Sequence, residues 1–139
     1  MTMNLQDAEV AEPKLAVRLQ TDKDGRPIVV QRDGTRHYSV LLEVRNAPAD
    51  TYAATFELDP TDYDPVRTLA PDAQGNIRLS TTTSGDFPVL VRISRSGGAN
   101  TVLKESVARA LRRGHETEPS AAGEDRSAIS QALNDIAAH

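Results

Sequence analysis

The stretch Phe56-Glu57-Leu58-Asp59-Pro60-Thr61-Asp62-Tyr63-Asp64-Pro65-Val66-Arg67 decides the fold that we predict. Apolar residues before and within it occupy every second position, the spacing of one face of a half-buried β-strand: Tyr52, Ala54, Phe56 and Leu58. This strand is expected to stop at Pro60, which has no N–H to donate to a neighbouring strand. Pro65 fixes a second backbone angle, so the segment between the prolines is expected to form a short, partly rigid loop. The pattern therefore predicts a strand that runs directly into an acidic loop.

Length and composition favour one domain with a modest core. The chain has 139 residues, of which 38% are hydrophobic and only 4% aromatic. Such a core must be filled mainly by valine, isoleucine, leucine and alanine. The formal net charge is -4, which argues against nucleic acid as a partner, because that binding depends on neutralising phosphates with lysine and arginine.

Several function classes are excluded by what the sequence lacks. The absence of cysteine excludes thiol catalysis, disulfides, iron-sulfur clusters and thiolate zinc sites, and it favours a reducing compartment. No apolar run approaches the roughly 18 residues of a membrane span, and the first residues have neither the basic nor the apolar part of a signal peptide. We therefore predict a cytoplasmic protein without a membrane partner.

Further strands are predicted on both sides of the opening stretch. Residues 1–13 are polar and unpatterned, and we interpret them as a flexible lead-in. Alternating or β-rich segments separated by turn residues then predict these strands: Lys14–Gln20, Ile28–Val30, Arg36–Arg45, Ile77–Thr82 and Phe87–Ile93. The tight turn Asp33-Gly34 is expected to precede the strongest of them.

After residue 93 the apolar spacing becomes helical. A first helix is predicted to begin at Asn100 or Thr101 and to end before Gly114, with Leu103, Val107, Ala110 and Leu111 on one face. Residues 114–125 are expected to be a linker. A second amphipathic helix is predicted at 126–139, with Ile129, Leu133 and Ile136 on one side. Taken together, the elements predict a mainly β protein: an immunoglobulin-like β-sandwich at 14–113 with a C-terminal helical extension.

Two motifs resemble those of a known family. Ala54 to Arg67 reads A-T-F-E-L-D-P-T-D-Y-D-P-V-R, and Thr82 to Phe87 reads T-T-S-G-D-F. The YEATS domains, immunoglobulin-like sandwiches that read acylated lysines, carry V-x-F-x-L-H-P-S-F-x-x-P-x-R followed by T-G-W-G-E-F. The overall pattern also looks like the prokaryotic YEATS-type domains of bacterial signalling and conflict systems. The resemblance covers roughly Arg36 to Ile93 and implies a YEATS-like sandwich.

The departures from the family pattern lie in its ligand site. The family holds acyl-lysine between two aromatic rings, and this chain has Asp62 and Ser84 at those positions. Asp59 and Thr61 replace the supporting histidine and serine. Each missing ring removes about 0.5–1.5 kcal/mol of stacking, and Tyr63, one residue away, supplies a single ring. The sequence therefore predicts that the aromatic sandwich for acyl-lysine is absent.

Acidic clusters leave a metal site as an alternative. Asp59, Asp62 and Asp64 form an oxygen-rich loop of the kind that hard cations prefer, and Asp22-Lys23-Asp24-Gly25 is a fainter calcium-like pattern. Aspartate is also an ordinary turn residue, since its carboxylate accepts hydrogen bonds from nearby backbone amides. We favour turns over metal in both segments, and a metal-dependent hydrolase is the less favoured alternative.

The histidines and glycines do not form a catalytic pattern. His37, His115 and His139 fall on a strand start, a linker and the terminus, without a serine and an acid placed for nucleophilic catalysis. The segment Ser96-Gly97-Gly98 lacks the lysine and the spacing of a phosphate-binding loop. We predict solvated histidines, a flexible strand-to-helix joint at 96–98, no cofactor and no enzyme activity.

These observations predict a non-enzymatic protein-binding, peptide-binding or adaptor module. A role in a bacterial signalling or conflict system is implied by the resemblance alone. The ligand is expected to contact two loops that the family brings together: Asp59, Thr61, Asp62, Tyr63, Thr83, Ser84, Gly85, Asp86 and Phe87. Arg67 is expected to hold the first loop by a charge-assisted hydrogen bond. The alternative is a structural role, with self-association or docking through the two C-terminal helices.

Overall fold

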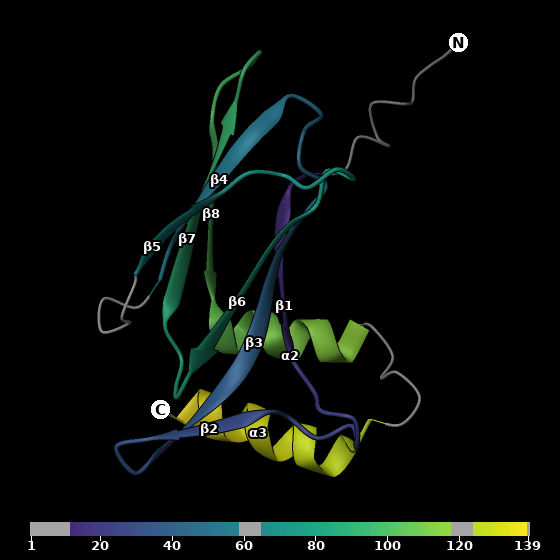
Figure 1. The fold of residues 1–139 in the computed structure, drawn as a ribbon, viewed down its shortest axis with the longest axis vertical. Helices are drawn as coiled ribbons and strands as arrows, with labels where there is room; N and C mark the ends of the chain where they lie inside the picture. The colour runs from purple at the N-terminus through teal and green to yellow at the C-terminus, as the bar shows by residue number, and fades with distance from the viewer. Residues whose placement is uncertain (1–11, 59–64, 118–123, 139) are drawn as a thin grey trace.

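The computed structural model describes residues 12–58, 65–117 and 124–138. Within these ranges, two four-stranded antiparallel sheets form a β-sandwich, and two helices lie at one end of it (Figure 1). Within the described residues, no helix is both long and apolar enough to span a membrane. The predicted class, a mainly β sandwich with a C-terminal helical extension, is confirmed.

The first sheet is organised around its longest strand, β3 (Thr35–Arg45). Strands β1 (Lys14–Leu19) and β2 (Val29–Arg32) pair with successive parts of β3 along one edge, and β6 (Ile77–Thr83) pairs with it along the other. β2 and β3 are joined by the predicted tight turn at Asp33 and Gly34, whose φ angles of 51° and 76° are those of a type I′ hairpin.

The second sheet has the order β5-β4-β7-β8. Its strands are β5 (Val66–Leu69), β4 (Thr51–Glu57), β7 (Pro88–Arg95) and β8 (Thr101–Ser106). Pro88 occupies the first position of β7, where a missing N–H costs the ladder least.

The core is built from the inward faces of both sheets, as the alternation predicted. The predicted faces are buried: Leu15, Val17, Leu19; Tyr38, Val40, Leu42, Val44; Ala54, Phe56, Leu58; and Phe87, Val89, Val91, Ile93. Burial of these apolar side chains is the main force that holds the sheets together, at about 25 cal/mol per Å² removed from water.

Two helices complete the core. Helix α2 (Val107–Thr117) buries Val107, Ala110 and Leu111, and α3 (Arg126–Ala138) buries an apolar stripe of Ile129, Ala132 and Ile136. The Asp125 carboxylate caps α3 by accepting a 3.1 Å hydrogen bond from the Ala128 N–H. A helix of this length is marginal alone in water, so this docking within the chain accounts for its formation.

The predicted start of the first helix is wrong. Residues 101–106 form strand β8, which pairs with β7, and segment 96–98 belongs to the connection between these two strands instead of a strand-to-helix joint. Asn100 serves that connection, because its Oδ1 accepts a 3.2 Å hydrogen bond from the Arg95 N–H. Leu103 fits a helical spacing with Val107, but cross-strand pairing with Val91 decides its conformation.

The predicted end of that helix is also wrong, because Gly114 lies inside α2. A Cβ added at this position would lie 2.9 Å from the Val17 carbonyl oxygen. Gly114 is therefore needed for the close approach of α2 to β1, and it does not terminate the helix.

Tyr52 does not share the buried face of β4, although its spacing predicted this. The register of β4 against β7 shifts between Thr51 and Ala53, and Tyr52 is 60% exposed. A bulge inserts an extra residue and reverses the alternation on one side of it. The strand β5 was not predicted at all, since four residues are too few for a clear period.

Candidate functional site

The two predicted loop segments leave the sheets at the same end of the sandwich. Glu57, the last residue of β4, pairs with Leu90 near the start of β7, and the β6–β7 connection leads into that start. The Leu58 N–H donates a 2.6 Å hydrogen bond to the Pro65 carbonyl, which closes the base of the first loop. Asp59, Thr61, Asp62 and Tyr63 lie outside the described residues, so their contact with a ligand stays a prediction.

The β6–β7 connection is shaped by Thr83. Its hydroxyl donates a short hydrogen bond to the Gly85 carbonyl and accepts one of 3.2 Å from the Gly85 N–H. Thr83 is 5% exposed, and Phe87 is buried in the core. These two side chains therefore fix the conformation of the turn, and among the predicted residues of this segment Ser84 and Asp86 present side chains nearer the surface.

Asp86 caps helix α2. Its Oδ1 accepts hydrogen bonds from the Ala108 N–H at 3.0 Å and from the Ser106 hydroxyl at 2.9 Å. The Ser106 oxygen in turn accepts a 3.2 Å hydrogen bond from the Arg109 N–H. A carboxylate at a helix N-terminus satisfies free amides and complements the helix dipole. The sequence did not predict this role, because the helix was expected to begin several residues earlier.

A polar groove of about 440 Å³ opens beside Ser84. Its walls come from the β2–β3 hairpin, the β6–β7 connection and α3, with these residues: Gly34, Thr35, Arg36, Tyr38, Ser84, Gln131 and Asp135. The Tyr38 hydroxyl donates a 2.5 Å hydrogen bond to Asp135 Oδ2. Burial raises the pKa of the Tyr38 phenol, and the hydrogen bond to Asp135 raises it further.

The groove offers hydrogen-bonding groups of both kinds and charges of both signs. Arg36 supplies donors and a positive charge, Asp135 supplies acceptors and a negative charge, and Gln131 supplies both donors and an acceptor. A peptide main chain also presents donors and acceptors alternately. The arrangement is therefore suited to a polar or zwitterionic segment of chain.

No pair of exposed aromatic rings lies at this end within the described part of the chain. Tyr38, Phe56 and Phe87 are buried, and the exposed Tyr52 lies at the opposite end of β4. Ser84, at the position of one family ring, lines the groove with a hydroxyl.

No protein-family model matches this chain, and a search of the curated proteins finds no match. Among solved structures, the Yaf9 YEATS domain recognizing an H3K122suc peptide has a TM-score of 0.43 and 14% identity, over 66% of this chain and 68% of that chain. The Yaf9 YEATS domain bound to H3K27ac has a TM-score of 0.42 and 14% identity, over 67% of this chain and 71% of that one. Because both likenesses are weak, the function is proposed below from this chain's own residues.

Asp22, in the fainter of the two predicted acidic segments, has the turn role that the sequence favoured. Within the described residues, no three histidine, aspartate or glutamate side chains are grouped so that they could hold a metal. Asp22 Oδ1 accepts hydrogen bonds from the N–H groups of Asp24 and Arg26 at 2.9 and 3.1 Å, so it stabilises its own turn. The Asp59–Asp64 cluster lies outside the described residues.

His115 is not a solvated linker residue, which corrects the prediction. It lies in α2 and is half-buried, and its Nε2 accepts a 3.2 Å hydrogen bond from the Leu19 N–H. His115 follows the buried Leu111 by four residues, the spacing of one helix face. That spacing was a usable signal, but the assumed helix end at Gly114 concealed it.

Arg67 reaches toward the first sheet. It lies on β5, and its Nη1 donates a 3.5 Å hydrogen bond to the Ser80 carbonyl of β6. This contact joins the edges of the two sheets. The predicted contact of Arg67 with the first loop concerns residues outside the described part of the chain.

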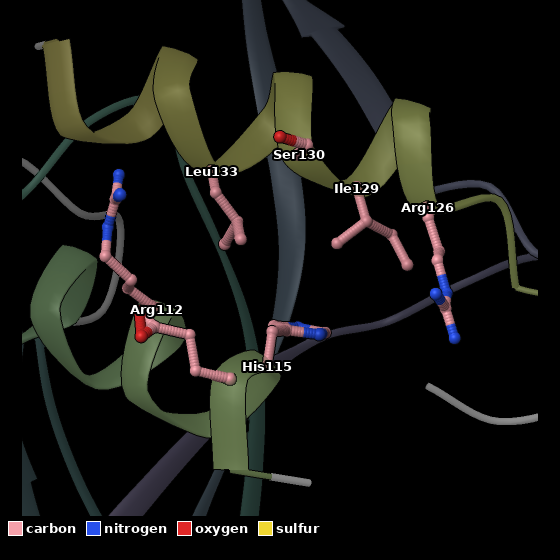
Figure 2. Close-up of a pocket in the computed structure, with 7 residues that line it drawn as sticks. Arg112, His115, Arg126, Ile129, Ser130 and Leu133 are labelled. Carbon is pink, nitrogen blue, oxygen red and sulfur yellow. The ribbon is translucent and has the colours of Figure 1, made fainter. Parts of the chain in front are cut away.

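A second groove, of about 510 Å³, lies between α2 and α3. Figure 2 shows Ile129 and Leu133 pointing from α3 toward α2, while Arg112 and His115 extend from α2. Arg126 stands at one end of the groove, and Glu116 and Ser130 complete its lining. No pattern in the sequence indicated this groove, because its walls meet only when α3 docks.

Proposed function

We propose that this chain is a non-enzymatic protein-binding or peptide-binding module that acts as an adaptor. The proposed contact surface is the end of the sandwich where the β4–β5 and β6–β7 connections leave the sheets. The observation that supports it is the polar groove beside Ser84, bounded by Arg36 and Asp135. The predicted loop residues Asp59, Thr61, Asp62 and Tyr63 belong to the same proposed surface.

The chemistry of the groove favours main-chain and charged-group recognition over acyl-chain stacking. The Tyr38 hydroxyl is already hydrogen-bonded to Asp135, and the residue as a whole is only 4% exposed. Among the described residues at this end of the sandwich, a ligand acyl group therefore finds no exposed aromatic ring to stack on. We propose that the ligand is a polar segment of another protein and that any modification on it is not held by an aromatic sandwich.

A role in a bacterial signalling or conflict system is proposed from the sequence resemblance alone. A cytoplasmic setting is proposed from the absence of cysteine in the sequence. The groove does not favour any particular cellular system, because polar peptide-binding surfaces occur in many systems.

A peptide array tests the proposal. Purified protein is applied to arrayed peptides with varied charge, including lysine peptides with and without acyl groups. We expect retention of a subset of polar peptides, with little change on acylation. The variant Ser84→Arg places a large side chain in the groove. Its binding to that subset of peptides is expected to be at least tenfold weaker. Ala99→Arg, an exposed change in the distant β7–β8 connection, is the matched control. Equal binding by both variants overturns the proposal.

A further inference from the structure

Strand β2 has an apolar edge that no other described strand covers. It pairs only with β3 among the described strands, and all four of its residues are exposed. Ile28, Val29 and Val30 are consecutive and are 37%, 42% and 36% exposed. The other exposed large apolar residues that the structure describes stand singly on other strands. An uncovered apolar edge is a template for pairing with another strand.

The backbone of this edge is free to form a ladder on its outer side. The Asp33-Gly34 turn makes Arg32 and Thr35 a hydrogen-bonded pair, and the pairing type alternates along the hairpin. The 3.0 Å hydrogen bond from the Ser39 N–H to the Ile28 carbonyl agrees with this alternation. The N–H and C=O groups of Val29 and Gln31 therefore point away from β3.

The charges around this edge favour an acidic partner. From residue 26 to residue 37 the sequence has three arginines, Arg26, Arg32 and Arg36, and Asp33 is the one acidic residue. Arg26 shares its charge with Asp125 at 3.4 Å in an exposed ion pair. The hairpin is thus basic within a chain of net charge -4. Pairing with a second copy would bring two basic hairpins together, whereas an acidic strand is attracted.

We propose that the β2 edge binds an extended peptide of another protein by strand addition, and that this peptide alternates apolar with acidic side chains. Val29 and Gln31 each supply one donor and one acceptor to its main chain. The valine side chains of β2 contact its apolar residues, and the flanking arginines attract its carboxylates. No residue of β2 lines the groove beside Ser84, so the strand edge is a different surface from the groove. Arg36, which pairs with Gln31 of β2, borders both.

Three synthetic peptides serve as probes. They have equal length and alternate valine with glutamate, with serine or with lysine. Fluorescence anisotropy is expected to show the tightest binding for the glutamate probe, at least tenfold weaker binding for the lysine probe, and loss of this difference at high salt. Methylation of the glutamate probe's alternate amides that face β2 is expected to abolish binding. Absence of binding, equal affinity for the glutamate and lysine probes, or full binding by the methylated probe overturns the proposal.

A protein variant tests the edge itself. Gln31→Pro removes an N–H that does not bond to β3, so the melting temperature is expected to stay unchanged. The affinity for the glutamate probe is expected to fall at least tenfold. Ser84→Arg is expected to bind that probe no more weakly than the unaltered protein does, and this result would separate the strand edge from the groove. Hydrogen exchange on the unaltered protein gives the same test without a variant. Protection of the Val29 and Gln31 amides by the probe is expected, and unchanged exchange there contradicts strand addition.

Discussion

Tyr38 and Asp135 are joined by a 2.5 Å hydrogen bond, although 97 positions separate them in the sequence. The bond links β3 to α3, and its two residues form part of the wall of the groove beside Ser84. The C-terminal helix is therefore a structural component of the proposed contact surface, since it supplies Gln131 and Asp135 to it.

Replacing Tyr38 by phenylalanine is expected to lower the free energy of unfolding by about 1 kcal/mol, the usual contribution of one such hydrogen bond. Because the pKa of Tyr38 is raised, its stabilisation is fully present below the ordinary value of 10.0. It is lost as the pH rises through the folded-state pKa.

Urea unfolding of both proteins between neutral and strongly alkaline pH checks this prediction. The difference between wild type and Tyr38→Phe is expected to shrink above about pH 10. Tyr52→Phe, at an exposed position, is the control and should behave as wild type at every pH. A difference that stays constant with pH contradicts the role assigned to the hydroxyl.

Asp50 is expected to contribute to acid sensitivity. The hydrogen bond from Arg95, at 2.8 Å, lowers the pKa of Asp50, and the Gly97 N–H at 2.9 Å lowers it further. Its contribution is therefore present above the ordinary value of 3.8 and is lost as the pH falls through the lower folded-state pKa. Melting temperatures from pH 7 downward should fall less steeply for Asp50→Asn below about pH 4. Parallel curves count against this assignment.

Asp86 is predicted to stabilise the fold whatever it does for a ligand. Asp86→Ala removes the cap of α2 and should cost about 1–2 kcal/mol in the free energy of unfolding. Asp24→Ala, a change at an exposed turn aspartate that caps no helix, should cost far less. Equal effects of the two changes on chemical unfolding rule out the capping role.

Gly114→Ala is expected to destabilise the protein, although alanine favours an isolated helix by roughly 1 kcal/mol over glycine. The added Cβ meets the Val17 carbonyl oxygen at 2.9 Å, and overpacking of this kind costs about 1–3 kcal/mol. Arg112→Ala, an exposed change on the same helix, is the control and should be close to neutral. A higher melting temperature for Gly114→Ala is the contrary result.

The strands of the core were predictable because one physical cause, burial of one face, controls both their sequence and their structure. β3 alternates over its whole length, so Tyr38, Val40, Leu42 and Val44 were all assigned to the correct face. The prediction for β8 was wrong because apolar and polar residues do not alternate cleanly along it: the exposed Val102 is followed by the partly buried Leu103. The spacing of Leu103 and Val107 also fits one face of a helix. The bulge at Tyr52 depends on the pairing of β4 with β7, and the need for Gly114 depends on the contact of α2 with Val17. These partners are distant in the sequence, so no local pattern shows them.

The candidate site was predictable only in part for the same reason. The resemblance named Ser84 among the expected contact residues, and Ser84 lines the groove, while its contact with a ligand stays a prediction. It did not identify Arg36, Gln131 or Asp135, which reach the groove from the hairpin and from α3. Tertiary contacts bring these residues together, and no local pattern encodes them.

The most direct test of the proposed peptide site is an amide chemical-shift titration with the peptide that the array retains most strongly. The largest shifts are expected at Arg36, Ser84, Gln131 and Asp135. Shifts confined to the opposite end of the sandwich, around Asn46 and Ala99, contradict the proposal that the groove is the contact surface.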